Sequence, residues 1–303
     1  MITDKDTNTI YFSEKLKEQF PEIAGEIYST LDLLGADCRF LSGTKDVWAR
    51  DYMPVQVNGH KFIQYRFHPD YLQQLEDIKS DPESICTNLN LKTVKSDIVL
   101  DGGNVIKSDN CIIMTDKVVL ENIQTYSRDQ LLTKLKDLFE VDKIVLIPWD
   151  RGERYGHADG MVRFIDNETV LLQGYYKTRK ELFENEFIEY LLGSLKENHL
   201  KYEFLNIDYP EKINAKFAYL NYLQTKDFIL LPSLGIEKDD EDLEKEILKY
   251  FPVYKGRIRK VKMNGIIARG GALNCISWTK KESQIRHKSK SGFSFEDHEK
   301  INK

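Results

Sequence analysis

Four short stretches of the sequence place reactive or acidic side chains beside glycine or tryptophan. They are Trp48-Ala-Arg-Asp51, Asp101-Gly-Gly-Asn104, Gly156-His-Ala-Asp159 and Arg269-Gly-Gly-Ala-Leu-Asn-Cys275. Glycine lets a backbone approach a ligand closely, while Cys, His and Asp can supply a nucleophile, a proton shuttle and anionic contacts. Each stretch alone has an ordinary explanation, because a single cysteine is more often a small buried hydrophobe and Asp-Gly-Gly is common in turns. Only together do the four stretches need a common explanation.

The order of these stretches along the chain resembles that of one known group of enzymes. A W-x-R-D block, an acid-Gly-Gly-Asn block, a Gly-His-x-Asp block, the block Tyr219-Leu-Asn221 and a Gly-Gly-x-x-x-Cys block follow one another before Trp278. The pattern is similar to that of the agmatine deiminase and bacterial peptidylarginine deiminase family, in the guanidino-group-modifying superfamily. The resemblance implies a pentein-like α/β fold, a closed five-bladed propeller of pseudo-fivefold ββαβ units around a central site.

The resemblance also implies a role for each matching residue. Cys275 matches the nucleophile, His157 the proton shuttle, and Asp101 the acid that orients this histidine. Asp51 and Asp159 match the acids that bind the guanidinium group of the substrate.

The chemistry of a guanidinium group fits this set of side chains. The group is a planar cation with a poorly electrophilic carbon, so paired carboxylates can bind it in fork geometry and hold the carbon for attack. A thiolate is a strong nucleophile near neutral pH, and a bound cation lowers the pKa of a nearby thiol. One histidine can protonate the departing ammonia and then activate water. The expected path leads through an amidino-cysteine intermediate to a ureido product, without a metal or an organic cofactor.

Four positions depart from the family pattern. Asp101 stands where glutamate is usual, Met53 where glycine is usual, and Asn274 where histidine precedes the cysteine. Arg269 stands where similar agmatine deiminases carry glycine. If the Arg269 side chain turns inward, it repels the terminal ammonium of agmatine and attracts a carboxylate; otherwise it forms a surface salt bridge. These changes bear on the substrate more than on the chemistry.

The leading hypothesis is a cysteine-dependent deiminase that hydrolyses a small guanidino compound, with agmatine as the first candidate. Trp48 and Arg269 complete the candidate substrate contacts. Arginine or peptidylarginine deiminase is one alternative, and amidinotransfer to an amine is another. A catalytically inactive guanidino-binding protein is the non-enzymatic alternative. An unrelated cysteine hydrolase acting on amides would leave the acids unexplained, because neutral carbonyls need an oxyanion hole.

The elements that must position these residues follow an α/β order. We predict helices over residues 178–198, from 128 onward and over 237–251. The first two begin with capping-box pairs, Thr178 with Glu181 and Ser127 with Gln130. The predicted strands cover residues 61–67, 98–101, 111–115, 117–121, 143–148, 161–165, 169–173, 228–232 and 265–268. They come in pairs or triplets separated by single helices, so local hairpins are expected rather than strict βαβ alternation.

Composition is that of an ordinary soluble globular protein. The 303 residues are 41% hydrophobic, enough for a full core, and the net charge of −5 argues against nucleic acid and suits a cationic small molecule. No run approaches the ~20 apolar residues of a membrane span, and the N-terminus lacks the apolar region of a signal peptide. The four cysteines form no CxxC pair, so we expect a reducing cytoplasm.

We expect one catalytic domain over residues 1–278, because no sharp linker divides the chain before that point. Residues 279–303 are polar and charged with little to bury, so a flexible tail or a short surface helix is expected there. The sequence makes no prediction of oligomeric state.

Overall fold

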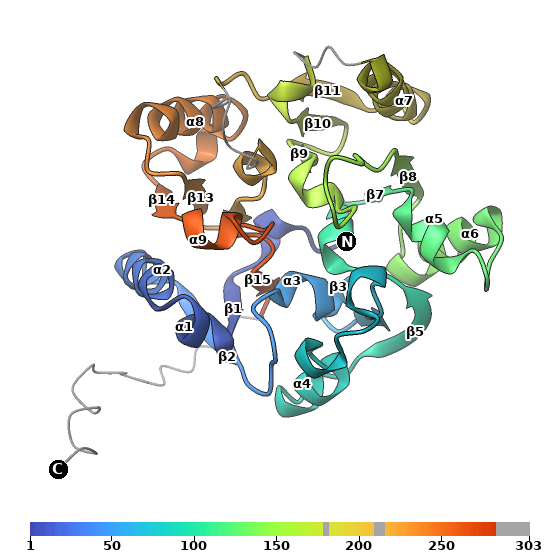
Figure 1. Ribbon diagram of the computed structural model, residues 1–303, viewed down its shortest axis with the longest axis horizontal. Helices are drawn as coiled ribbons and strands as arrows, with labels where there is room; N and C mark the ends of the chain where they lie inside the picture. The colour runs from blue at the N-terminus through green and yellow to red at the C-terminus, as the bar shows by residue number, and fades with distance from the viewer. Residues whose placement is uncertain (178–181, 209–215, 283–303) are drawn as a thin grey trace.

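The structure, a computed structural model, describes residues 1–177, 182–208 and 216–282. Within these residues, fifteen strands form five separate three-stranded sheets. Figure 1 shows the sheets as blades arranged around a common centre, with most of the longer helices on the outside of the ring. The predicted five-bladed α/β propeller is therefore confirmed.

All five blades repeat one topology. The sheet orders are β15-β1-β2, β3-β4-β5, β6-β7-β8, β9-β10-β11 and β12-β13-β14. In each blade the middle strand pairs antiparallel with the first strand and parallel with the third. A parallel partner needs a crossover connection, and helices supply it between the second and third strands. Each blade is thus a ββαβ unit.

The bounds of the elements follow from this repeat. The strands are β1 (Thr9–Ser13), β2 (Asp37–Leu41), β3 (Val55–Gln56), β4 (Phe62–Arg66), β5 (Val94–Val99), β6 (Ile106–Lys107), β7 (Cys111–Thr115), β8 (Lys143–Ile147), β9 (Val162–Phe164), β10 (Thr169–Leu172), β11 (Lys201–Phe204), β12 (Leu223–Gln224), β13 (Ile229–Ser233), β14 (Ile258–Lys262) and β15 (Ser277–Lys280). The helices are α1 (Lys15–Gln19), α2 (Pro21–Leu33), α3 (Ala49–Tyr52), α4 (Pro82–Asn88), α5 (Lys117–Asn122), α6 (Arg128–Phe139), α7 (Leu182–Glu197), α8 (Glu237–Tyr250) and α9 (Asn264–Ile267).

Strands from the two ends of the described chain close the ring. Strand β15 pairs antiparallel with β1, so that Thr9 lies opposite Lys280 and Phe12 opposite Ser277. The expected domain boundary at residue 278 therefore falls inside a strand. Residues 283–303, most of the predicted tail, lie outside the described residues.

Apolar stripes fix the outer helices on their sheets. Helix α6 begins with the predicted capping box, in which Ser127 and Gln130 bond to each other's backbone N–H. It buries Leu131, Leu135 and Phe139. Helix α7 likewise buries an apolar stripe, while the predicted cap pair at 178 and 181 lies outside the described residues.

Two runs predicted as strands are helical. Residues 117–121 belong to α5, and residues 265–268 fall largely within α9. Short apolar runs cannot be assigned by periodicity alone. In the first case strand β7 has already ended at Thr115, and the backbone N–H groups of Val119 and Leu120 bond to the carbonyl of Asp116, which begins a helical turn.

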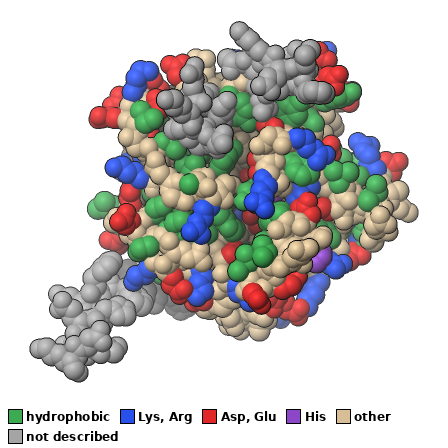
Figure 2. Space-filling view, in the orientation of Figure 1, with side chains coloured by type: hydrophobic (Ala, Val, Ile, Leu, Met, Phe, Trp, Pro, Cys, Tyr) green, Lys and Arg blue, Asp and Glu red, His purple; other side chains and the backbone are tan. Residues whose placement is uncertain are grey.

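No described helix is both long and apolar enough to cross a membrane. On the face shown in Figure 2, basic and acidic side chains are interspersed around the ring, with apolar side chains between them. The coloured residues of that face form no continuous basic surface.

Candidate active site

The candidate residues are carried by the segments that lead into the first strand of each blade, which we call the entry segments. Short helical turns mark them: α3, η4 (Gly102–Asn104), η5 (Ala158–Gly160), η7 (Lys216–Leu220) and α9. Asp51 lies in α3, Asp101 directly precedes η4, and His157 and Asp159 belong to the start of η5. Cys275 lies between α9 and β15. The propeller therefore brings residues more than 200 positions apart to one place.

A cavity of about 220 Å³ lies among these segments, and we call it the catalytic cavity. Four of the predicted site residues line it: Trp48, Asp51, His157 and Cys275. The other two acids, Asp101 and Asp159, contact this set directly, as described below.

Two glycines allow the segments to approach so closely. A Cβ on Gly103 would lie 2.7 Å from both Oδ1 of Asp51 and Nδ1 of His157. A Cβ on Gly271 would lie 2.2 Å from the ring of Trp48. Side chains at either position would displace the site, so the glycine content of the motifs reflects close approach as well as turns.

His157 is held between two carboxylates. Its Nε2 lies 2.9 Å from Oδ2 of Asp101, and its Nδ1 lies 3.6 Å from Oδ1 of Asp51. Burial alone would lower the pKa of His157, but the charge of Asp51 and the hydrogen bond to Asp101 raise it to about 10. The imidazole is therefore protonated at neutral pH. The shorter side chain at position 101 reaches the histidine without a bridging group.

Asp101 is stabilised as an anion. It is 2% exposed, and burial by itself would raise its pKa. The hydrogen bond from His157, and the charges of His157 and Lys117, lower the pKa of Asp101 below its usual value. Nζ of Lys117 lies 3.3 Å from Oδ2 of Asp101.

Lys117 was not predicted as part of the site. Its ammonium is buried and also lies 3.2 Å from Oδ1 of Asp70 and 3.3 Å from Oε1 of Glu121. The hydroxyl of Tyr71 donates to Oδ2 of Asp101 over 3.2 Å, and Nζ of Lys117 lies 4.8 Å from the Tyr71 ring centroid. Lys117 therefore ties the segment around residue 70, which lines the cavity, to the histidine–aspartate pair.

The thiol of Cys275 is buried beside an acid. Its Sγ lies 3.6 Å from Oδ2 of Asp159, and its backbone N–H donates to Oδ1 of Asn221 over 3.2 Å. Burial, then the charges of Asp159 and Asp51, raise the pKa of the Cys275 thiol well above its usual value. Without a ligand, the thiol is therefore neutral near pH 7.

Negative charge is concentrated around the cavity. Burial, together with the charges of Asp101 and Asp159, raises the pKa of Asp51 to about 7, although His157 opposes the shift. The backbone N–H of Gly103 donates to Oδ1 of Asp51 over 3.0 Å. The cations are His157 and Lys117, and Lys117 is shared with Asp70 and Glu121, so the acids remain in excess and a further cation is favoured beside Asp51 and Asp159.

Aromatic rings enclose the site. Trp48, Tyr71 and Tyr155 line the cavity, and the ring centroids of the two tyrosines lie 6.2 and 6.0 Å from that of His157. Flat rings of this kind suit a planar cation.

Arg269 does not face the cavity. Its side chain is exposed, with the guanidinium carbon 4.9 Å from the centroid of Phe20. Only its backbone carbonyl is directed toward the site, where it accepts a hydrogen bond from the hydroxyl of Tyr155 over 3.3 Å. The next residue, Gly270, lines the cavity instead. The inward orientation considered from the sequence is not adopted, so this substrate contact is withdrawn.

Across residues 1–177, 182–208 and 216–282, no group of three or more His, Cys, Asp or Glu side chains is arranged to hold a metal ion.

Comparison with known proteins gives one family match and several structural matches. The sequence model of the Porphyromonas-type peptidyl-arginine deiminase family matches residues 2–280. Agmatine deiminase of C. jejuni is similar in structure, with a TM-score of 0.72 and 18% identity, over 93% of this chain and 96% of that chain. Agmatine deiminase of Enterococcus faecalis has a TM-score of 0.70 and 19% identity, over 93% and 95%. At these identities the likeness shows the fold. We found no match among curated proteins.

Proposed function

Because the chain belongs to the Porphyromonas-type peptidyl-arginine deiminase family, we propose that it is a cysteine-dependent deiminase that hydrolyses a guanidino compound to a ureido product and ammonia. One observation carries the proposal beyond family membership. A buried thiol, a protonated histidine and three buried carboxylates meet at a single cavity, in which a cation is electrostatically favoured.

The acids bind and orient the substrate. Asp51 and Asp159 approach the guanidinium and direct its carbon toward Sγ of Cys275, which lies 3.6 Å from Oδ2 of Asp159. Paired carboxylates match the planar N–H donors of a guanidinium, so binding fixes the position and orientation of the substrate before the reaction.

The bound substrate activates its own nucleophile. In the free protein, burial and two acids disfavour the thiolate of Cys275. A guanidinium between those acids neutralises them and places a positive charge beside the sulfur, so the pKa of the thiol falls when substrate binds. Reactivity is thereby confined to the complex.

His157 then transfers protons. As the substrate binds, the Cys275 thiol gives up its proton to solvent. The thiolate then forms an S–C bond, and a terminal nitrogen leaves as ammonia after it receives a proton from the imidazolium. The resulting neutral imidazole removes a proton from water, whose oxygen bonds to the amidino carbon as the S–C bond breaks. Water thus supplies the ureido oxygen, and His157 regains its proton from that water. The Cys275 thiolate takes up the proton that the ureido product releases, so both residues return to their starting states. Asp101, 2.9 Å from Nε2, orients the ring throughout.

The rest of the cavity wall bears on which guanidino compound fits. It is lined by Asp46 and the exposed Arg154, together with the apolar residues Leu72, Leu75 and Ile78. Asp46 already accepts hydrogen bonds from the N–H of Trp48 and the hydroxyl of Ser80. The carboxylate of Asp46 could bind the ammonium of agmatine, which favours agmatine as substrate. The guanidinium of Arg154 could bind the carboxylate of arginine or of a peptidylarginine, which favours those substrates instead.

Ammonia release across a substrate panel tests the proposal. The panel holds agmatine, arginine, N-acyl-arginine amides and methylated arginines, with Cys275→Ala as blank. Release from at least one compound without an added amine supports hydrolysis. Turnover that requires an added amine would establish amidinotransfer instead, and no turnover with any compound would support a binding protein.

A further inference from the structure

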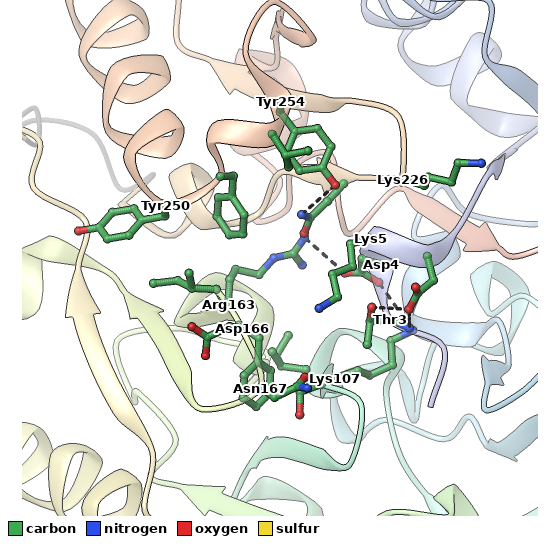
Figure 3. Close-up of a pocket in the computed structure, with 18 of the residues that line it drawn as sticks. Thr3, Asp4, Lys5, Lys107, Arg163, Asp166, Asn167, Lys226, Tyr250 and Tyr254 are labelled. Carbon is green, nitrogen blue, oxygen red and sulfur yellow. Dashed lines mark hydrogen bonds and ion pairs between the residues drawn. The ribbon is translucent and has the colours of Figure 1, made fainter.

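A second cavity, of about 420 Å³, has a buried arginine in its wall (Figure 3). We call it the Asp4 cavity. Arg163 lies on β9, four residues after Asp159, and is 4% exposed. Figure 3 shows the side chains of Arg163 and Lys107 both extending toward Asp4, which comes from the N-terminal turn η1 (Asp4–Asp6). Nothing in the proposed mechanism uses these residues.

Contacts on several sides fix the guanidinium of Arg163. Its Nη2 donates to the carbonyl of Tyr222 over 3.0 Å and lies 3.4 Å from Oδ2 of Asp4. The guanidinium carbon lies 4.4 Å from the centroid of the Tyr222 ring. Its other terminal nitrogen, Nη1, donates to Oδ1 of Asn274 over 3.3 Å. Arg163 therefore connects the Asp4 cavity to the residue that precedes Cys275.

This contact determines how the amide of Asn274 is oriented. Arginine has only donors, so the Asn274 atom that faces it must be the oxygen. The amide nitrogen then faces Oδ2 of Asp159, to which it donates over 2.7 Å. The opposite orientation would set two donors against each other and two acceptors against each other. The same Oδ2 lies 3.6 Å from Sγ of Cys275.

We propose that Arg163, held by Asp4, is a positioning residue of the active site: it fixes the amide of Asn274, which in turn fixes the carboxylate of Asp159 beside Cys275. The proposal rests on the proposed function in one respect, the use of Asp159 to bind the guanidinium of the substrate.

Asp4 acts as the counter-ion of this arrangement. Its Oδ1 lies 3.6 Å from Nζ of Lys107, whose side chain is 8% exposed. Burial would raise the pKa of Asp4, but the charges of Lys107, Arg163 and Arg50 lower it to about 2. Asp4 is therefore an anion at every working pH. Its loss would leave two buried cations without their shared partner, which is costly in a low-dielectric interior.

The Asp4 cavity makes the proposal testable by chemical rescue. Asp4→Ala removes the carboxylate next to a cavity large enough to admit formate. We expect kcat/KM for the best substrate to fall by about 10–100-fold, the range typical when a residue that orients a ligand-binding group is lost. Formate in the tens of millimolar should recover a large part of this loss, because it restores the anion at Arg163. Chloride at the same ionic strength should not.

A double-mutant cycle tests the route through Asn274. In an Asn274→Ala background, Asp4→Ala should change kcat/KM less than twofold, because the link to Asp159 is already absent. Lys5→Gln, at an exposed position of the same cavity, serves as the matched control and should leave wild-type activity unchanged. If Asp4→Ala yields no folded protein, Asp4→Asn, which removes the charge but keeps the side-chain volume, replaces it in the double-mutant cycle, and the cycle alone then decides.

The outcomes separate this inference from the proposed function. Formate rescue together with loss of the Asp4 effect in the Asn274→Ala background supports the positioning role. An Asp4 effect that persists in full without Asn274, or that formate does not reduce, overturns it while wild-type activity still supports a deiminase. A wild-type protein that releases no ammonia from any panel compound overturns the proposed function itself.

Discussion

The catalytic cavity and the Asp4 cavity contain buried charge in opposite balance. Around the catalytic cavity the acids are in excess: Asp51, Asp101 and Asp159 stand against His157 and the ammonium of Lys117, which is shared with Asp70 and Glu121. Around Asp4 the cations are in excess, because one carboxylate serves both Lys107 and Arg163.

This difference appears in the pKa values. In the catalytic cavity the pKa of Asp51 is raised to about 7 and that of His157 to about 10, so both groups bind a proton more readily than they do in water. In the Asp4 cavity the pKa of Asp4 is lowered to about 2 by its partners. In the proposed function the substrate brings a cation to Asp51 and Asp159, whereas Asp4 meets Lys107 and Arg163 of the chain itself. Among these buried carboxyls the pKa of Asp51 is raised, whereas the pKa values of Asp4 and Asp101, each of which contacts a lysine and a second cation of the chain, are lowered.

The largest expected effect is that of Cys275→Ala, which removes the only nucleophile of the proposed route. We expect kcat to fall about 10⁴-fold or more while the fold is retained. Acid trapping of wild-type protein with substrate should add mass to the peptide that contains Cys275. Label on Cys38, Cys86 or Cys111 would contradict the assignment.

Next in size is the effect of the histidine–aspartate pair. His157→Ala should lose 10²-fold or more in kcat/KM, as expected for a general acid–base group. Asp101→Glu should stay within about tenfold, or ~1.4 kcal/mol, because it keeps the carboxylate that orients the ring. Steady-state kinetics of both variants decide this. Equal losses would show that the shorter acid belongs to a geometry that glutamate cannot reproduce.

Thiol alkylation should reveal activation by a cation. Burial and two acids raise the pKa of Cys275, so neutral iodoacetamide should react slowly at pH 7 and still accelerate above pH 9. The cationic reagent 2-chloroacetamidine should be favoured by at least about tenfold over its reactivity ratio with free cysteine, since it supplies the missing charge. Asp159→Asn should reduce that preference. Equal preference in both proteins would remove Asp159 from the cation site.

The two cavities should also respond to opposite ends of the pH scale. The pKa of His157 is raised from 6.5 to about 10, so its contribution to folding is complete below pH 6.5 and is lost as pH rises through 10. The pKa of Asp4 is lowered from 3.8 to about 2, so its contribution is present above pH 3.8 and is lost as pH falls through 2. Denaturant unfolding of wild type, His157→Gln and Asp4→Asn at several pH values measures both, with differences on the order of 1 kcal/mol or more. If the loss of unfolding free energy had the same pH dependence in His157→Gln and Asp4→Asn, the proposed contrast between the two cavities would be wrong.

The smallest expected effect is that of Arg269→Gly. Since this side chain packs on Phe20 outside the cavity, the ratio of kcat/KM for agmatine and arginine should change by less than about twofold. Arg154→Gln, at a residue that lines the cavity, should shift the ratio toward agmatine. A larger change for Arg269 than for Arg154 would return Arg269 to the site.

The sequence predicted the residues of the candidate site better than it predicted the strands of the sheets. The motif residues are reactive types at fixed spacing, so they can be recognised before any contact is known. The third strands β2, β11 and β14 carry many exposed polar residues, and the first strands β3, β6 and β12 are two residues long. Neither kind shows the apolar alternation from which strands are predicted, so these edges were missed.

Supporting residues were missed for a different reason. Lys117 opens a short apolar run that is typical of a strand, and Arg163 lies within a predicted strand. Their importance arises from partners distant in sequence: Asp101 for Lys117, and Asn274, 111 residues away, for Arg163. No local pattern encodes such a pairing. Arg269 shows the converse, because proximity to the nucleophile in sequence did not place its side chain in the cavity.

The pairing of β1 with β15 has a consequence for biosynthesis. During translation, His157 and the acids leave the ribosome long before Cys275, which lies two residues ahead of β15. Pairs as distant as Thr9 and Lys280 can form only after nearly the whole described chain has emerged, and such non-local pairing is slow. The step that joins the first strand to the last also brings the thiol to the acids. A nascent chain therefore holds His157 and the three acids before it has the thiol that the proposed reaction requires.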